Sequence, residues 1–549
     1  MVVESLETGL LTGRLDTGLL GGFPEQDAAD RAVGDVWVAR AEAFVTEHVP
    51  DPDALDATRE LPDGLIDALR REGLLTVAFA GELGGAALSP YNVLRVVAAA
   101  AAKSVPVGQI IAIQAGVGVG ALHPALPEGP LRDMVRDRIR GGALSGFGDT
   151  DQAGQNNRLP TMTATLDGDD YVLRGDKLYT GNGPVADLLA VSATLDGGIG
   201  VCFVDTASEG FSVDSVVEFI GSNGLPNGAL SFDGVRVPKE HVLSGGEGQL
   251  RLPAMINSIA FLGRIYFTGA PALAVARNCL EWSRSFVNRR MIDGRPLGEY
   301  DRIQRMVSRA MADVYAMDSL ARWSLIGGGI TDRWLERFVA KNVLTRTAWK
   351  LADRTVALMG AEGLETAASK RRRGAPVLPA ERALRDARGF RMAGNVDFQL
   401  DSQVAQLLLT AYYRGERPVP GECATDTAGL DLAPRNQVHL DAVVEQTRWF
   451  AQTCAEATKS PQAELFADEE FLVTSGRIAA ELVAASAVLA RTAALGTSEA
   501  QDLADVHCTA ALTRLAGLWR RLSPDGRPEH HKMSRGWLTG STFEFLTTT

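Results

Sequence analysis

Residues 390–401, FRMAGNVDFQLD, hold two side chains that could accept a proton. Asp397 and Asp401 are the only carboxylates of this stretch. A carboxylate that is shielded from water has a raised pKa and can act as a general base. Asp397 is therefore the candidate catalytic residue. An aspartate at such a point more often hydrogen-bonds the turn or caps the next helix.

The composition indicates a soluble protein of more than one domain. A chain of 549 residues can form several hydrophobic cores, and 46% hydrophobic with 22% charged residues is typical of globular proteins. The net charge of −13, without a stripe of Lys and Arg, argues against a nucleic-acid partner. Five cysteines without CxxC spacing indicate free thiols in a reducing, cytoplasmic compartment: Cys202, Cys279, Cys423, Cys454 and Cys508.

The sequence offers no sign of a membrane span or a metal site. The most apolar segment, residues 96–122, is interrupted by Lys103, Pro106 and several glycines, which favours a buried helix. The N-terminal residues are acidic where a secretory signal would be basic. The seven histidines are scattered without ligand spacing, so we predict no bound metal.

Hydrophobic periodicity changes twice along the chain. Apolar residues first recur at helical spacing, then short β-rich runs alternate with Asp-Gly and Gly-Gly turns, and helical spacing returns afterwards. We therefore expect a mainly α-helical protein with a central β domain. Its parts would be a flexible leader (1–30), an N-terminal helical domain (31–140), an antiparallel β sandwich or barrel (141–245), a C-terminal four-helix bundle (246–412), a linker (413–436) and an extra C-terminal helical domain (437–549).

Five short segments follow one another in an order that resembles a known family. They read FGDTDQAGQN (147–156), YVLRGDKLYTGNG (171–183), LSFDGVRVPKEHVLSGGEG (230–248), RRMIDGRPLGEYDRIQ (289–304) and ALMGAEGLETA (357–367). With these motifs, residues 31–412 resemble the acyl-CoA dehydrogenase superfamily of flavoproteins. The last helical block resembles the C-terminal extension of its very-long-chain members.

The resemblance implies an FAD cofactor that is held in part by the β domain. Phe147 and Thr150 match positions of a loop that lies against the flavin ring. Tyr179 matches an aromatic residue that stacks near the flavin. Gly181 stands where a threonine hydroxyl usually meets the flavin, and Asn182 follows it in the same motif.

A second set of cofactor residues is implied in the helical bundle. Arg290 matches a guanidinium that clamps the FAD pyrophosphate across a subunit boundary, which implies a homo-oligomer and favours a dimer. Asp301 replaces a glutamine in contacts to the adenine side. Gly360 and Gly363 match glycines that let the backbone approach the dinucleotide.

The implied reaction is the α,β-desaturation of an acyl thioester, for which most members supply a glutamate in an E-G-T-x-E-I-Q turn. Here that turn reads AGNVDFQ, so the base position is Gly394, or Ala393 with a one-residue shift. A minority carry the base on an earlier helix beside an arginine. That arginine is Arg264, a predicted substrate-binding residue, and Gly263 precedes it. Asp397 aligns with a second, structural acidic position of the turn.

Three hypotheses follow from the missing glutamate. In the first, desaturation is retained and another carboxylate serves, with Asp397 as the nearest candidate and Glu362 and Glu365 as weaker ones. In the second, the fold is a flavin-dependent monooxygenase or N-hydroxylase, which needs no base for an α-proton. In the third, it is a paralogue without redox activity that serves as a scaffold or a repurposed enzyme. The extra C-terminal domain favours the first hypothesis over the second.

The implied partner is an acyl thioester on coenzyme A or on an acyl carrier protein. Gln155 and Asn156 replace a Ser-Asp pair beside the thioester arm, so both are predicted to bind substrate. The basic segment SKRRRGAP (369–376) is an insertion relative to the family. It is either a solvated loop or a docking patch for the phosphates of coenzyme A or for an acidic carrier protein.

Overall fold

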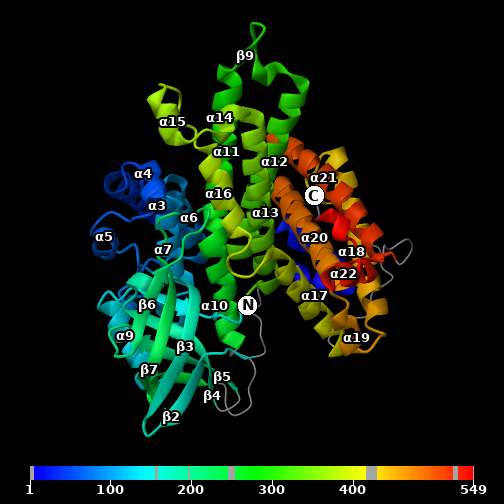
Figure 1. Ribbon diagram of the computed structural model, residues 1–549. Helices are drawn as coiled ribbons and strands as arrows, with labels where there is room; N and C mark the ends of the chain where they lie inside the picture. Colours follow the sequence, from blue (N-terminus) through cyan, green and yellow to red (C-terminus); the bar gives the residue numbers. More distant parts are fainter. Residues whose placement is uncertain are drawn as a thin grey trace.

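The computed structural model describes residues 5–154, 159–195, 198–244, 254–415, 429–523 and 529–547. The chain forms four blocks: N-terminal helices, a β domain, a set of long helices and further helices near the C-terminus. In Figure 1 the first two blocks lie on the left, the long helices in the centre and the C-terminal helices on the right. The predicted mainly α-helical fold with a central β domain is confirmed.

The N-terminal helical block is built around two long helices. α3 (Ala28–His48) begins after Asp27, whose carboxylate accepts hydrogen bonds from two backbone N–H groups of the first turn. α6 (Pro90–Lys103) packs along α3 and is followed by α7 (Val105–Gly116), which is buried along its whole length. The shorter helices of this block are α4 (Pro52–Thr58), α5 (Leu65–Arg71), α8 (Val119–Leu122) and α9 (Pro130–Arg140).

The β domain holds one mixed sheet, whereas the turn signals predicted antiparallel pairing alone. Its strands are β1 (Ser145–Gly148), β2 (Thr163–Asp167), β3 (Asp170–Gly181), β4 (Leu188–Leu195), β5 (Gly198–Asp205), β6 (Phe211–Val216), β7 (Asn227–Pro238) and β8 (Val242–Ser244). The strand order is β6-β7-β3-β2-β4-β5-β8, and β1 and β2 each pair with β4 in parallel. A tight turn dictates the antiparallel β2–β3 hairpin, but β1 reaches β4 from a distant segment, so no local turn sets its direction.

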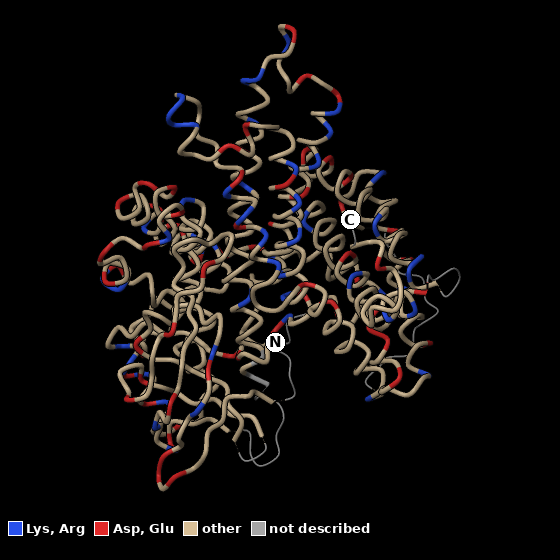
Figure 2. The backbone as a smooth tube through the Cα atoms, in the orientation of Figure 1, with Lys and Arg blue, Asp and Glu red and all other residues tan. Residues whose placement is uncertain are grey.

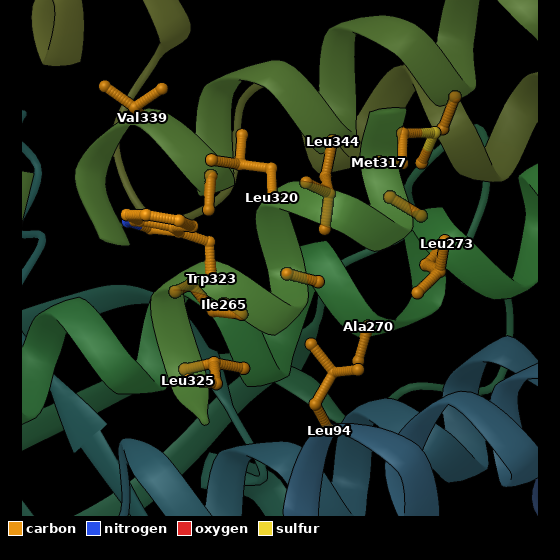
Figure 3. Close-up of a cluster of buried hydrophobic side chains, with 14 of the residues drawn as sticks. Leu94, Ile265, Ala270, Leu273, Met317, Leu320, Trp323, Leu325, Val339 and Leu344 are labelled. Carbon is orange, nitrogen blue, oxygen red and sulfur yellow. The ribbon is translucent and has the colours of Figure 1, made fainter. Parts of the chain in front are cut away.

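Long helices cross the centre of the molecule and form its main core. They are α10 (Ala254–Arg264), α11 (Ala270–Arg289), α12 (Asp301–Leu325) and α13 (Trp334–Met359), with a π-helical turn, η5 (Ile265–Gly269), between the first two. Figure 3 shows how apolar side chains of these helices and of α6 meet in one buried cluster. Its labelled members are Leu94, Ile265, Ala270, Leu273, Met317, Leu320, Trp323, Leu325, Val339 and Leu344.

Short elements join the ends of the long helices. A hairpin of β9 (Met291–Ile292) and β10 (Arg295–Pro296) connects α11 to α12 and lies at the top of Figure 1. The elements after α13 are α14 (Ala361–Leu364), α15 (Ala367–Arg372), α16 (Ala380–Phe390) and α17 (Asp397–Tyr413). Because α16 and α17 both pack on α13, the turn between them is held against the central helices.

The predicted flexible leader is wrong for residues 5–21, which form two packed helices. α1 (Leu6–Thr12) and α2 (Thr17–Gly21) bury their leucines in the main core. The carboxylate of Glu336 accepts hydrogen bonds from Ser5 Oγ at 2.9 Å and from the Leu6 N–H at 2.7 Å. The partner residue lies more than 300 positions away in sequence, so local periodicity alone could not reveal the packing.

The C-terminal helices pack against the central block through α17. They are α18 (Pro434–Ala457), α19 (Gln462–Ala467), α20 (Glu469–Leu495), α21 (Ser498–Leu522) and α22 (His530–Leu538). Gly476 of α20 approaches α17 so closely that a Cβ there would lie 1.9 Å from the Asp401 carbonyl oxygen. Much of the predicted linker, residues 416–428, lies outside the described residues.

Three helical segments are long and apolar enough to cross a membrane by length and composition: Val105–Ala125, Ser258–Arg289 and Glu469–Leu495. Each instead packs inside the protein, with 89%, 78% and 72% of the respective apolar window buried. The segment that the sequence analysis interpreted as a buried helix, residues 96–122, overlaps most of the first of them. Burial against other helices explains its hydrophobicity.

Candidate functional site

Tyr179 is presented by an irregularity near the end of β3. The pairing of β3 with β7 shifts register between Lys177 and Thr180. Tyr179 has a φ of 57°, a conformation that costs free energy in a residue with a side chain. Its side chain is 55% exposed, and its ring centroid lies 5.9 Å from that of Phe219. The bulge therefore offers an aromatic surface on which a flat ligand can stack.

Buried polar atoms follow Tyr179 along the chain. Thr180 Oγ1, Asn182 Oδ1 and Asn227 Oδ1 have no hydrogen-bond partner within the described part of the chain. Leaving such an atom unpaired costs roughly 1–3 kcal/mol, so these atoms suit a polar ligand. Thr180 and Asn227 were not predicted from sequence. Thr180 lies next to Tyr179 within the YVLRGDKLYTGNG segment, and Asn227 is the first residue of β7.

The loop after β1 joins the same region. The Thr150 carbonyl accepts a hydrogen bond from the Leu178 N–H at 2.7 Å. A Cβ at Gly181 would lie 2.6 Å from Ile113 Cδ1 of α7, so packing requires glycine there. The structure thus brings together five predicted residues, which we call the β-domain cluster: Phe147, Thr150, Tyr179, Gly181 and Asn182.

The predicted pyrophosphate residues form a second group at the end of α11. Arg290 is exposed at the start of the β9–β10 hairpin, and its guanidinium pairs with none of the described residues. The neighbouring Arg289 forms an ion pair with Glu362, which joins the end of α11 to α14. Glu362 is therefore engaged at this end and is unsuited to replace the missing base.

The two predicted glycines of this group differ in their surroundings. Gly360 has a φ of 60°, and a Cβ there would meet nothing within 4 Å, so its backbone is open to a ligand. Gly363 is closely packed, because a Cβ there would lie 2.6 Å from the Val356 carbonyl oxygen. Asp301 is exposed and accepts a hydrogen bond from Arg305 Nε at 3.0 Å. We call Arg290, Asp301, Gly360 and Gly363 the hairpin cluster.

The β-domain cluster and the hairpin cluster lie at different ends of one chain. In Figure 1 the β9–β10 hairpin and α14 are at the top, whereas the sheet is at the lower left. A single copy therefore cannot bring both clusters to one dinucleotide. The predicted substrate residues Gln155 and Asn156 lie outside the described residues.

Asp397 is held by two arginines and is not placed to serve as a base. Its carboxylate accepts hydrogen bonds from Arg346 Nε at 3.0 Å and from Arg391 NH2 at 2.6 Å. Arg346 and Arg391 outweigh the effect of burial and lower the pKa of Asp397 to about 2. A carboxylate with such a low pKa is a weak proton acceptor, which favours the structural interpretation of Asp397 over the catalytic one.

Glycine stands at both positions that the family resemblance matches to a glutamate. A Cβ at Gly263 would lie 2.1 Å from the Gly116 carbonyl oxygen of α7. Gly394 has a φ of 65°, and a Cβ there would lie 3.0 Å from Arg264 Cγ. A side chain at position 263 would collide with backbone, whereas one at position 394 would strain the backbone and require the Arg264 side chain to shift.

Arg264, the predicted substrate residue, lies beneath the 393–396 turn. Its guanidinium carbon is 5.6 Å from the ring centroids of both Phe261 and Phe338. Burial lowers the pKa of Arg264 to about 10, and the charge of Asp149 opposes this shift without direct contact. The π-helical turn η5 starts at the next residue, a distortion that is frequent at functional sites.

Lys341 lies below the same turn and was missed by the sequence analysis. Its ammonium group is fully buried and donates a hydrogen bond to the Asn395 carbonyl oxygen at 2.7 Å. Burial, followed by repulsion from Arg264, lowers the pKa of Lys341 to about 7. The turn therefore covers two basic side chains, Arg264 and Lys341. In the sequence, Lys341 stands out only as a lysine within a largely apolar helical run.

A buried polar group connects the loop after β1 to the sheet. Lys177 Nζ donates to the Asp149 carbonyl oxygen at 3.1 Å and to Ser192 Oγ at 3.2 Å. Ser192 Oγ in turn donates to Asp149 Oδ1 at 2.9 Å. These bonds fix the backbone that carries Phe147 and Thr150, so they position the β-domain cluster.

The basic segment SKRRRGAP is largely engaged within the chain. Lys370 is buried and donates to the Leu378 carbonyl oxygen at 2.6 Å. Arg371 pairs with Asp51 and Asp53, and Arg373 pairs with Glu365. Figure 2 shows the segment as a blue end of α15, close to acidic residues. Residues 371–374 are exposed at the surface, but Arg371 and Arg373 are already paired within the chain, and the pairing with Arg373 makes Glu365 unsuited to act as a base.

The described residues contain no group of three or more His, Cys, Asp or Glu side chains that could hold a metal ion. Four cysteines, Cys202, Cys279, Cys454 and Cys508, are buried free thiols. Cys423 lies outside the described residues.

Comparison with solved structures identifies this architecture. An acyl-CoA dehydrogenase from Bacillus anthracis, solved in complex with FAD, superposes with a TM-score of 0.79 over 99% of this chain and 96% of that chain, at 18% identity. Butyryl-CoA dehydrogenase from Megasphaera elsdenii superposes with a TM-score of 0.61 over 69% of this chain and 98% of that chain, at 21% identity. The first match includes the C-terminal helices.

Sequence comparison leads to the same family. FadE10, a probable acyl-CoA dehydrogenase of Mycobacterium tuberculosis, is 27% identical over 93% of this chain and 85% of its own length. A 3-sulfinopropanoyl-CoA desulfinase of Advenella mimigardefordensis is 26% identical over 64% of this chain and 88% of its own length. Models of the N-terminal, middle and C-terminal domains of acyl-CoA dehydrogenase match residues 36–125, 147–235 and 262–406. The chain therefore belongs to the acyl-CoA dehydrogenase family.

Proposed function

We propose that the protein is an FAD-dependent oxidoreductase of an acyl thioester in which the 393–396 turn supplies no base. The observation that carries this proposal is the position of Arg264, whose side chain lies where a residue at Gly394 would extend. A thioester bound beneath the turn would meet a guanidinium instead of a carboxylate. The family and its fold support the coarser assignment to flavin-dependent chemistry on acyl-CoA.

The residues present fit a flavin dinucleotide. The exposed ring of Tyr179 offers a stacking surface, and the unpartnered atoms of Thr180, Asn182 and Asn227 offer polar contacts. Arg290 and the open backbone at Gly360 suit the pyrophosphate. When bound, FAD would accept the electrons of the oxidation.

The chain's own residues would bind and orient the substrate. The fully buried Lys341 holds the 393–396 turn through Asn395, and Asp397 fixes the start of α17 through Arg346 and Arg391. The acceptor of the α-proton is not in this turn. Asp149, whose charge acts on Arg264, is the carboxylate to test first, by comparing Asp149→Asn with Asp397→Asn.

A monooxygenase on the same fold is the second candidate function. The observation that favours it is the loss of the carboxylate at both Gly263 and Gly394, together with the low pKa of Asp397. Oxygen chemistry on a reduced flavin needs no acceptor for an α-proton. Both candidates share the fold and the cofactor, so they differ only in the reaction that FAD supports.

The experiment is an anaerobic titration of purified protein, followed by its visible spectrum. Bleaching of bound FAD by acyl-CoA thioesters supports the oxidoreductase. FAD that stays oxidised under these conditions, with turnover in air when a reductase supplies reduced flavin, supports the monooxygenase. A colourless protein that FAD cannot reconstitute contradicts both and favours the paralogue without redox activity.

The proposal includes a cytoplasmic location and a homodimer. The buried free thiols are compatible with a reducing compartment. The separation of the β-domain cluster from the hairpin cluster supports a dinucleotide site shared by two copies. The carrier of the acyl group would be coenzyme A or an acyl carrier protein. Arg371 and Arg373 are paired with carboxylates of the same chain and Lys370 is buried, so these residues offer no particular support for the acyl carrier protein.

A further inference from the structure

Arg264 is a cation without a direct anionic partner in the part of the chain that the structure describes. Its guanidinium forms neither a hydrogen bond nor an ion pair there, and the rings of Phe261 and Phe338 lie next to it. The residue is partly buried.

No carboxylate is in direct contact with Arg264 among the described residues. The charge of Arg264 contributes to lowering the pKa of Lys341, whose ammonium group is held by the Asn395 carbonyl oxygen. Asp397 is the carboxylate nearest to the turn in sequence. Its charge is balanced by ion pairs with Arg346 and Arg391. Asp149 acts on Arg264 only at a distance beyond an ion pair. A buried cation without a paired anion is costly, so this arrangement favours an anion supplied by a ligand.

The aromatic neighbours of Arg264 leave its N–H edge available. The rings of Phe261 and Phe338 both lie 5.6 Å from the guanidinium carbon. Contacts of this kind restrict the orientation of the guanidinium plane and do not engage its N–H donors. A carboxylate can accept two parallel N–H bonds from such a group, which gives both affinity and orientation.

We propose that Arg264 binds a carboxylate carried by the acyl part of the thioester, so that the substrate is the monothioester of a short dicarboxylic acid. This inference rests on the proposed function, because it places the acyl group beneath the 393–396 turn. Because Gly394 has no side chain, the aliphatic part of the Arg264 side chain lies against the 393–396 turn. In the proposed binding mode, the reacting carbons of the substrate lie beneath the same turn. The acid group therefore lies within a few carbons of the thioester.

The test measures binding to the purified holoprotein by calorimetry, with thioesters matched in chain length. Succinyl-CoA is compared with butyryl-CoA, and glutaryl-CoA with pentanoyl-CoA. Because a charge-assisted hydrogen bond is stronger than a neutral one, the acidic thioester of each pair should bind on the order of tenfold more tightly. Equal affinities in both pairs overturn the proposal, and this comparison needs no variant.

Variants assign the preference to Arg264. Arg264→Met should remove the preference, so that the acidic and the neutral thioester of each pair bind with equal affinity, whereas Arg264→Lys should keep part of it. Arg136→Gln removes an exposed arginine of α9 that pairs with Asp133 and Asp137, and it serves as the matched control. A preference that survives in Arg264→Met contradicts the assignment.

The outcome also separates this inference from the proposed function. If no acyl-CoA binds and FAD is not bleached by any thioester, the proposed function fails. If neutral thioesters bind and bleach FAD as well as acidic ones do, the proposed function stands and the inference about Arg264 fails.

Discussion

At the scale of single residues, Asp397 shows how its neighbours decide what a carboxylate can do. The sequence places it in the turn where the family carries its base, but Arg346 and Arg391 hold it as a charged anchor at the start of α17. Its low pKa follows from these two cations, which outweigh the effect of burial. Arg264, by contrast, has no carboxylate in direct contact within the described part of the chain.

We predict that Asp397→Asn lowers stability without abolishing flavin reduction. Removing one member of a buried ion pair leaves the arginines uncompensated, which costs about 3 kcal/mol. Thermal unfolding measures the first effect, and the rate of FAD bleaching per folded holoprotein measures the second. Asp502→Asn, at an exposed position of α21, is the control. Loss of bleaching in a variant that folds and holds FAD would show that Asp397 is the base after all.

At the scale of elements, the segment before the turn joins three blocks of the protein. Arg385 of α16 binds the Asp56 carboxylate of α4 through two hydrogen bonds of 3.0 and 2.6 Å. The next residue, Asp386, accepts the Ser222 N–H of the β6–β7 loop at 2.6 Å. The RDAR segment that resembles the family is thus a junction between the N-terminal helices, the sheet and the bundle, and it holds the 393–396 turn in place.

Asp386 predicts a pH-dependent stability. Burial raises its pKa from 3.8 to about 6 in the folded protein, against the opposing effect of Arg382 and Arg385 and with the support of Asp56. Ionising Asp386 therefore lowers the free energy of unfolding. This loss is absent below pH 3.8, grows as the pH rises and is complete above about 6. Asp386→Asn removes this cost, because its amide oxygen can still accept the Ser222 N–H.

The measurement compares melting temperatures of Asp386→Asn and the unaltered protein at pH 4 and pH 7. The substitution should raise the melting temperature more at pH 7 than at pH 4. The difference should correspond to at most about 3 kcal/mol in the free energy of unfolding. Asp214→Asn, at an exposed position of β6, is the control and should show no such difference. An equal gain at both pH values would contradict the predicted ionisation of Asp386.

At the scale of the whole molecule, the residues suited to one dinucleotide are divided between two ends of the chain. The β-domain cluster offers a stacking surface and polar atoms, and the hairpin cluster offers Arg290 and the open backbone of Gly360. A closed dimer can place the hairpin cluster of one copy beside the β-domain cluster of the other. FAD binding should therefore depend on dimer formation.

A mixing experiment tests this arrangement. Tyr179→Ala and Arg290→Glu should each weaken FAD binding in a homodimer, because each damages both shared sites. A heterodimer of the two variants, isolated with two affinity tags, combines one undamaged site with one doubly damaged site and should hold about one FAD. FAD absorbance per dimer gives the result. A heterodimer without FAD, formed by variants that are folded and dimeric, would contradict a site shared between two copies.

The sequence by itself determined the order of the blocks, the family and the loss of the glutamate at residues 263, 393 and 394. Periodicity and turn signals are local, and the motifs are contiguous, so one chain sufficed for these conclusions. Tertiary structure alone decided that Asp397 is neutralised, that Lys341 and Arg264 share the space below the turn and that residues 5–21 are packed. It also paired the cations of the SKRRRGAP segment within the chain. These contacts join residues that are far apart in sequence, such as Ser5 and Glu336, and they depend on how whole helices pack.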